Sequence, residues 1–234
     1  MTTKVIQAAD EVSPRRSGGR PTRDAAAQRD ERVMGMAANL FLDRGFDLAS
    51  MDALAEAAGV GKATLYARFG DKRQLFVAVI RQEIGRWLAP LSAIVEQVIA
   101  DDSAVAVEET LLEIGRQMTR RSLEPRVVAL GRVISMQAPF FPELAELAHE
   151  EGWLRAVSAV ARLLDRLTAQ GALCILNPEI AADLLLNLVL GRSMRRAAYG
   201  IALDETAVEQ RLQAAVRLFL HGATHRPQHT EDAT

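Results

Sequence analysis

The sequence predicts an all-α protein. Its apolar residues recur three and four positions apart, which places them on one face of a helix, and the alternation typical of strands is hard to find. Capping residues, glycines and prolines mark the expected helix ends. Apolar residues make up 49% of the 234 positions, so the chain can bury a sizeable core in one or two domains.

Charge is divided unevenly along the chain. The net charge is −2, but residues 1–86 carry 14 basic and 11 acidic side chains, whereas residues 87–234 carry 14 and 19. A basic first part and an acidic second part indicate that only the first part meets a polyanion.

Neither a signal peptide nor a membrane-spanning segment is expected. Residues 1–32 contain no apolar run suited to a signal peptide. The most apolar stretch, residues 180–190, is too short to span a bilayer and contains Asp183 and Asn187. Cys174 is the only cysteine, which fits a reducing compartment. We therefore expect a cytoplasmic protein without a membrane segment.

Residues 1–22 are expected to form a flexible basic arm. They mix serine, proline, glycine and charged residues without periodicity, and arginines surround Ser17-Gly18-Gly19. The arm is interpreted either as a contact to phosphates or the minor groove of DNA or as a solvating tail.

Three helices are expected in residues 23–72, followed by a long one. They begin near Asp24, after the N-cap Ser50 and near Lys62, and they end at Gly45, Gly59 and Phe69. The fourth helix starts after Gly70-Asp71, carries an apolar stripe and is expected to bend or end near Pro90.

The remaining chain reads as further helices. Pro139 and Pro142 interrupt the pattern, and Asn177-Pro178 is a clear start signal, an N-cap followed by proline at the first helical position. The expected helices are residues 103–122, 124–137, 143–170, 178–198 and 205–221. Residues 224–234 are expected to be a loose tail.

Residues 50–69 have the layout of a helix-turn-helix, in which the second helix enters the major groove of DNA. Small Ala55 and Ala58 allow a close helix crossing, and Gly59 supplies the positive φ of the turn. Leu65 and Phe69 anchor the second helix. The outward side chains are Lys62, Ala63, Thr64, Tyr66, Ala67 and Arg68. Several of these suit phosphates or base edges, and the alternative is an ordinary helical hairpin with a solvated basic face.

The flanks of this motif make the sequence resemble the tetracycline-repressor (TetR/AcrR) family of bacterial regulators. The resemblance covers about residues 23–80 and rests on three patterns. These are Ala37-Ala38-xx-Phe41-xxx-Gly45, Leu54-Ala-xx-Ala-Gly59-Val, and Thr64-Leu65-Tyr66-xx-Phe69-xx-Lys72-xx-Leu75. The family implies an all-α homodimer that binds a palindromic operator, usually as a repressor, and leaves it when a small ligand occupies the second domain.

The resemblance also implies which residues contact DNA. Lys62, Ala63 and Thr64 begin the recognition helix and would lie nearest the base edges. Ser50, Tyr66 and Lys72 would hold phosphates, and Arg68 is a candidate for either contact.

The second domain matches the family only in general style, so its surfaces are weighed separately. Residues 180–190 are apolar on nearly every side, and the last helix carries an apolar stripe, so residues 178–198 and 205–221 are expected to form a homodimer interface. The alternative is that both are core helices.

A pocket for an apolar or amphipathic effector is predicted from methionines and aromatic residues. The candidates are Met118, Met136, Phe140, Phe141, Trp153, Leu186 and Met194. For each residue alone, the alternative is core packing. The Phe140-Phe141 pair between two prolines is the strongest candidate.

Other polar groups are interpreted more plainly. His149-Glu150-Glu151 fits a solvated helix face, and Cys174 an inert thiol. Arg192, Arg195 and Arg196 lie near a helix C-terminus, where positive charge is favourable; an acidic ligand is the alternative.

The sequence thus predicts a ligand-responsive DNA-binding transcriptional regulator, with a helix-turn-helix domain in residues 23–72 and a long helix that connects it to a helical-bundle ligand-binding and dimerisation domain in residues 73–223. No catalytic residue, metal or cofactor is expected. An enzyme is disfavoured because phosphate loops, nucleophile elbows and metal-ligand spacings are not found, and a protein-interaction adaptor is the third hypothesis.

Overall fold

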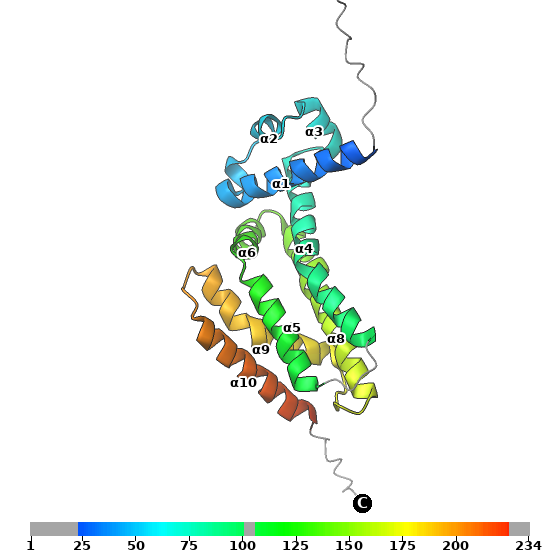
Figure 1. The fold of residues 1–234 in the computed structure, drawn as a ribbon. Helices are drawn as coiled ribbons and strands as arrows, with labels where there is room; N and C mark the ends of the chain where they lie inside the picture. The colour runs from blue at the N-terminus through cyan, green and yellow to red at the C-terminus, as the bar shows by residue number, and fades with distance from the viewer. Residues whose placement is uncertain (1–22, 101–105, 225–234) are drawn as a thin grey trace, which may run out of the picture.

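A computed structural model describes residues 23–100 and 106–224, and within them every regular element is a helix. Figure 1 shows α1, α2 and α3 forming a head at one end, from which α4 runs into an elongated bundle. The all-α expectation is confirmed. The expected basic arm lies outside the described residues, as does the tail beyond Thr224.

The head consists of α1 (Arg23–Leu48), α2 (Met51–Ala58) and α3 (Lys62–Phe69). Gly45 leaves the helical conformation with φ 76°, where the sequence predicts the end of the first helix, and one further short turn follows it. Phe41, Phe46 and Phe76 stack against one another beneath this turn, with ring centroids 4.8–6.1 Å apart. The aromatic cluster fixes the head on the start of the connecting helix.

The connecting helix α4 (Lys72–Ala100) does not end at Pro90. Proline removes one backbone donor and crowds the preceding turn, which favours a helix end. However, Leu88 and Leu91 on either side of Pro90 are buried, so tertiary packing holds the helix together through the proline.

The chain continues through α5 (Val107–Ser122), α6 (Pro125–Gln137), α7 (Pro142–Leu147), the π-helical segment η1 (Ala148–Leu154) and α8 (Arg155–Ala169). The helical stretch expected over residues 143–170 is therefore present, and its middle is π-helical. There Glu151 pairs with Arg81 of α4 at 3.0 Å, and the buried Gly152 packs near Ile84. A π-helical turn contains one residue more than an α-helical turn. This π-helical segment lies where the contacts with α4 are made.

The last two helices are α9 (Pro178–Ala198) and α10 (Glu205–Thr224). The predicted start of α9 is confirmed, since the Asn177 side chain accepts a hydrogen bond from the Ile180 amide at 3.1 Å and Pro178 follows it.

Two apolar clusters form the core, and α4 belongs to both. The head cluster extends along α4 to Ile84 and includes Leu130 of α6 with Leu144 and Leu147 of α7. The bundle cluster begins at Leu88 of α4 and includes side chains of α5, α8, α9 and α10. Side chains of the second domain therefore complete the core of the head.

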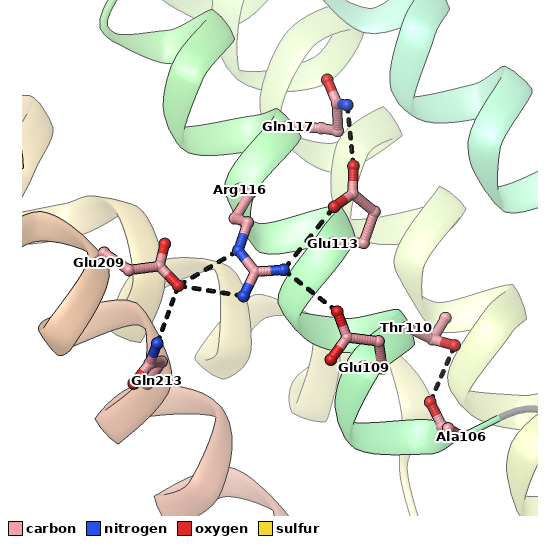
Figure 2. Close-up of polar contacts among 8 residues, drawn as sticks. All are labelled: Ala106, Glu109, Thr110, Glu113, Arg116, Gln117, Glu209 and Gln213. Atoms are coloured by element: carbon pink, nitrogen blue, oxygen red, sulfur yellow. Dashed lines mark hydrogen bonds and ion pairs between the residues drawn. The ribbon is translucent and has the colours of Figure 1, made fainter.

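A polar cluster fastens α10 to α5 (Figure 2). The guanidinium of Arg116 donates to Glu209 at 3.1 Å and to Glu109 at 3.3 Å, and it lies 3.8 Å from Glu113. Beside it Leu212 packs directly on Gly115, whose missing side chain allows the two helices to approach closely. The cluster fixes α10, one of the two helices at the expected subunit interface.

Candidate nucleic-acid interface

The turn between α2 and α3 holds the two helices at a fixed crossing. Ser50 caps α2 by accepting a hydrogen bond from the Ala53 amide at 3.1 Å. Gly59 adopts the left-handed conformation with φ 63°, and the next amide, that of Val60, donates to the Ala55 carbonyl at 3.0 Å. This C-terminal cap ends α2 and pairs the carbonyls of Ala55 and Glu56.

The recognition helix α3 is anchored on one side only. Leu65 is buried and Phe69 is half-buried against the head cluster. The remaining side chains of α3 are exposed, namely Lys62, Ala63, Thr64, Tyr66, Ala67 and Arg68. Anchoring and exposure therefore fall where the sequence predicts them, and Tyr66 is 46% exposed although it is aromatic.

The N-terminus of α3 presents backbone donors to solvent. Gly61 is its N-cap and makes no side-chain cap, and the first hydrogen bond of the helix runs from the Leu65 amide to the Gly61 carbonyl. The amides of residues 62–64 thus have no acceptor within the helix. Free amides and the positive end of the helix dipole favour an anion such as phosphate at this position.

Two cations of α3 are paired with carboxylates of neighbouring helices. Lys62 lies 2.7 Å from Asp52 of α2, and Arg68 lies 2.8 Å from Asp30 of α1. The hydrogen bond with Asp52 raises the pKa of Lys62, so its ammonium stays charged at neutral pH. Exposed pairs of this kind contribute little to stability because solvent screens them, so a phosphate can replace either carboxylate at little cost.

The hydroxyl groups of Ser50 and Tyr66 are also open to solvent. Although the Ser50 oxygen accepts the capping bond, its O–H can still be donated outward. The pairing of Asp52 with Lys62 and of Asp30 with Arg68 was not predictable from the sequence, because it depends on how the three helices pack.

Lys72 occupies a more enclosed position than the other predicted contacts. Its ammonium donates to the carbonyls of Phe46 at 2.9 Å, Asp47 at 3.3 Å and Ala49 at 3.1 Å. It also lies 4.3 Å from the centre of the Phe46 ring. An ammonium has three N–H groups, and all three are engaged here. Lys72 thus ties the α1–α2 connection to the first turn of α4, and its contact with phosphate stays a prediction.

The seven predicted effector residues do not gather around one cavity. Met118 and Leu186 are buried in the bundle core, at 2% and 3% exposure. The Trp153 indole donates to Asp183 of α9 at 2.7 Å. These three side chains act as packing residues in this structure, which is the alternative that the sequence left open.

The two phenylalanines between the prolines lie beside the head. Phe141 packs edge-on against Phe46, with ring centroids 4.8 Å apart, and the Arg73 guanidinium lies 4.6 Å from its ring centre. Phe140 points to solvent with 73% exposure. The pair therefore belongs to the junction between the two domains.

Met136 and Met194 line one groove between α6 and α9, with a volume of about 520 Å³. Arg132, Arg195 and Tyr199 add polar groups to it. The sequence did not identify these three residues as a group, because they converge only when α6 packs against α9. In the part of the chain that the structure describes, no three His, Cys, Asp or Glu side chains gather as a metal site requires.

Comparison with known families decides the identity of this architecture. Residues 34–79 match the model of bacterial regulatory proteins of the tetR family, and residues 109–222 match that of the C-terminal domain of AefR-like transcriptional repressors. The chain belongs to the TetR family of transcriptional regulators. Members of this family are DNA-binding proteins and not enzymes, so the enzyme and adaptor hypotheses are set aside.

Individual TetR-family relatives cover different shares of the chain. The transcriptional activator FasR of Mycolicibacterium smegmatis is 35% identical over 79 residues, which are 32% of this chain and 36% of FasR. The structure of the flavonoid-responsive regulator FrrA is 32% identical, with a TM-score of 0.66, and the match covers 86% of this chain and 99% of FrrA.

A TetR-family regulator from Mesorhizobium loti has a TM-score of 0.80 at 25% identity, with 88% of this chain and 100% of that chain covered. By contrast, this chain spans only 32% to 47% of the length of the first curated relatives that it matches. None of the helices in residues 23–100 and 106–224 is long and apolar enough to cross a membrane.

Proposed function

We propose that this chain is a ligand-responsive repressor that binds a palindromic operator as a homodimer and is released by a small apolar or amphipathic effector. The observation that carries the DNA-binding part is the exposed face of α3. Its open amides and the exposed side chains of Lys62, Thr64 and Arg68 supply donors on a helix that is anchored only by Leu65 and Phe69. Such a helix fits the major groove of duplex DNA.

The homodimer is supported by apolar side chains that α9 and α10 leave uncovered. Ile180 and Leu184 of α9 are 60% and 56% exposed, and Leu218 of α10 is 64% exposed. They line one groove with a volume of about 540 Å³. A clustered apolar surface of this kind is typical of a subunit interface, and a twofold axis there would give the two α3 helices the symmetry of a palindrome.

The effector is assigned to the groove between α6 and α9. Met136 and Met194 provide adaptable apolar walls, while Arg132 and Arg195 offer charged donors for a phenolate or carboxylate. The regulator FrrA, which is flavonoid-responsive by name, aligns with nearly all of its length to this chain. An aromatic molecule with acidic or phenolic groups is therefore the effector class that we favour.

Helix α6 provides a physical route from this groove to the head. On its other side Arg126 donates to Glu83 of α4 at 2.7 Å and to Asn39 of α1 at 2.6 Å. Just beyond α6, Phe141 packs on Phe46. An effector that displaces α6 from α9 would shift α1 and α4 together, and it must favour the DNA-free state by a few kcal/mol to empty the operator.

Repression is favoured over activation by the extent of the family matches. The model of AefR-like repressors matches 109–222, whereas the match to the activator FasR covers 79 residues in all. A promoter fusion with the selected operator decides the direction, since a repressor lowers expression and an activator raises it.

The direct test is selection of random duplexes by the purified full chain, followed by sequencing of the retained DNA. We expect a palindrome with half-sites about one helical turn apart. The matched control is the double variant Lys62→Glu and Arg68→Glu, which changes only exposed side chains and should retain no sequence. Enrichment of no sequence by the unmodified chain, or of the same sequences by the control, would overturn the assignment.

A further inference from the structure

A small cavity lies at the corner where α9 ends and α10 begins, apart from the DNA-binding face and the effector groove. Its volume is about 160 Å³. Three of its lining side chains are arginines, Arg192 and Arg196 from the end of α9 and Arg211 from α10. This concentration of positive charge lies in the acidic part of the sequence.

The described residues do not balance the positive charge of the corner. Among them, Asp204 is the only carboxylate that lines the cavity, and it already accepts a hydrogen bond from the Thr206 amide at 3.1 Å. Arg196 donates to the Ala202 carbonyl at 2.8 Å, which is a neutral group. The side chains of Arg192 and Arg211 have no hydrogen-bond or ion-pair partner among the described residues.

Arg211 gives the strongest indication that the corner binds a ligand. Its Nε is buried and has no acceptor within the described residues. A guanidinium remains charged at every physiological pH, so burial without an acceptor is unfavourable. Buried donors in native proteins almost always have partners, and an unpaired one points to a bound water or ion.

Helix dipoles do not account for the three arginines together. Arg196 is in the last turn of α9, where positive charge is favourable. Arg211, however, lies in the N-terminal half of α10, where the dipole gives a cation no stabilisation. A common anionic ligand explains all three positions.

We propose that this corner binds a small oxyanion, either phosphate or a short carboxylate. Planar guanidiniums bind both groups through paired hydrogen bonds, and three of them can surround one anion. The volume corresponds to about five water molecules, which suits phosphate or a dicarboxylate of a few carbons. The roomier and more apolar α6–α9 groove suits a larger effector.

The neighbouring groove suggests how the anion could act. Arg195 and Tyr199 of the same helix end line the α6–α9 groove, and Arg132 of α6 donates to the Ala197 and Ala198 carbonyls. An anion at the corner would therefore fix the end of α9 against which α6 packs. Its binding is expected to stabilise the bundle whether or not DNA is present.

The test is calorimetric titration of the full chain with inorganic phosphate and, separately, malonate, in buffers matched in ionic strength with chloride. We expect saturable binding of at least one anion, and the anion that binds identifies the ligand class. Arg211→Met should weaken it at least about tenfold. Arg192→Gln changes an exposed arginine and should weaken it as well, with an unchanged circular dichroism spectrum.

The matched control is Arg155→Met, which removes the same charge from the exposed start of α8 and should leave anion affinity within about twofold. Absence of saturable binding would overturn the proposal, as would equal affinities of the Arg211 and Arg155 variants. Binding that appears only after Leu184→Glu disrupts the apolar α9–α10 face would also overturn it. That result would mean that a carboxylate of a second copy fills the corner in the unmodified dimer.

Discussion

Two exposed surfaces of this molecule have opposite chemistry. The face of α3 presents cations, hydroxyls and free backbone amides, and its large apolar side chains, Leu65 and Phe69, are turned into the head. The α9–α10 face instead presents Ile180, Leu184 and Leu218, although similar residues of the same helices are buried in the bundle. Each surface keeps groups that the described residues leave uncovered, namely backbone amides on the first and apolar side chains on the second.

The difference between the two surfaces indicates two kinds of partner. A donor-rich face gains by meeting a polyanion, and its binding weakens as salt rises. An apolar face gains by leaving water, and its association depends little on salt. One surface therefore fits DNA and the other a second copy of the chain, and each can be disrupted without touching the other.

The largest effect is expected from a charge placed in the apolar face. Leu184→Glu would bury an unpaired carboxylate at each subunit contact, at a cost of about 3–5 kcal/mol. We expect a monomer by sedimentation velocity and a loss of operator affinity of about 100-fold or more. Leu154→Glu, at an exposed leucine of η1, is the control and should remain dimeric. A Leu184 variant that stays dimeric would show that this face is not the subunit interface.

A smaller effect is expected when Lys72 is replaced by methionine. Loss of its three carbonyl contacts should lower the free energy of unfolding by about 2 kcal/mol, since hydrogen bonds from a charged donor are the strong ones. If its role is internal, the salt dependence of DNA binding should not change. Chemical denaturation and binding at several salt concentrations measure the two quantities. If the slope of the logarithm of the DNA-binding constant against the logarithm of the salt concentration instead falls by about 1 in magnitude, with stability unchanged, Lys72 contacts a phosphate.

Lys62→Ala is expected to change sequence preference about tenfold at one base position, because its side chain begins the recognition helix. Tyr66→Ala should weaken binding to all duplexes by similar factors, as loss of a phosphate contact does. Competition binding against single-base variants of the operator distinguishes these patterns. Uniform weakening by the Lys62 variant would mean that Lys62 contacts the DNA phosphates and not the base edges.

The smallest effect concerns the junction between the two regions. Burial of the Glu83 carboxyl opposes its ionisation, but the hydrogen bonds and charges of Arg126 and Arg86 outweigh burial and lower its pKa below the usual 4.5. A lowered carboxyl pKa adds stability above the unfolded-state value, and this stability is lost as the pH falls through the folded-state value.

Glu83→Gln should therefore lower stability by about 1 kcal/mol at neutral pH and by less at acidic pH below the usual glutamate range. Thermal unfolding at the two pH values measures the difference. The matched variant Glu146→Gln changes an exposed carboxylate of α7 and should show no such trend. An equal loss at both pH values would mean that the charge of Glu83 contributes nothing.

The sequence predicted well those features that depend on neighbouring residues. Ser50, Gly59 and Asn177-Pro178 end or begin helices through contacts within four positions, so their patterns are readable directly. The anchoring of α3 by Leu65 and Phe69 follows from helical periodicity in the same way.

Features that depend on distant residues were not predictable. The π-helical turn lies where the chain meets Arg81 and Ile84 of α4, and Lys72 meets carbonyls 23 to 26 positions earlier. The methionines and aromatic residues gave no indication of which side chains face a cavity, because their type suits a core equally well. Met136 and Met194 share a groove only through the packing of α6 on α9.

The most direct test of the account is the stoichiometry on DNA, measured by sedimentation velocity with the selected duplex and with a duplex that carries one half-site. We expect two chains on the full palindrome and affinity for the half-site that is lower by about 100-fold or more. One chain per duplex, or equal affinity for the two duplexes, would contradict the claim that the α9–α10 face pairs two copies so that both α3 helices reach the DNA.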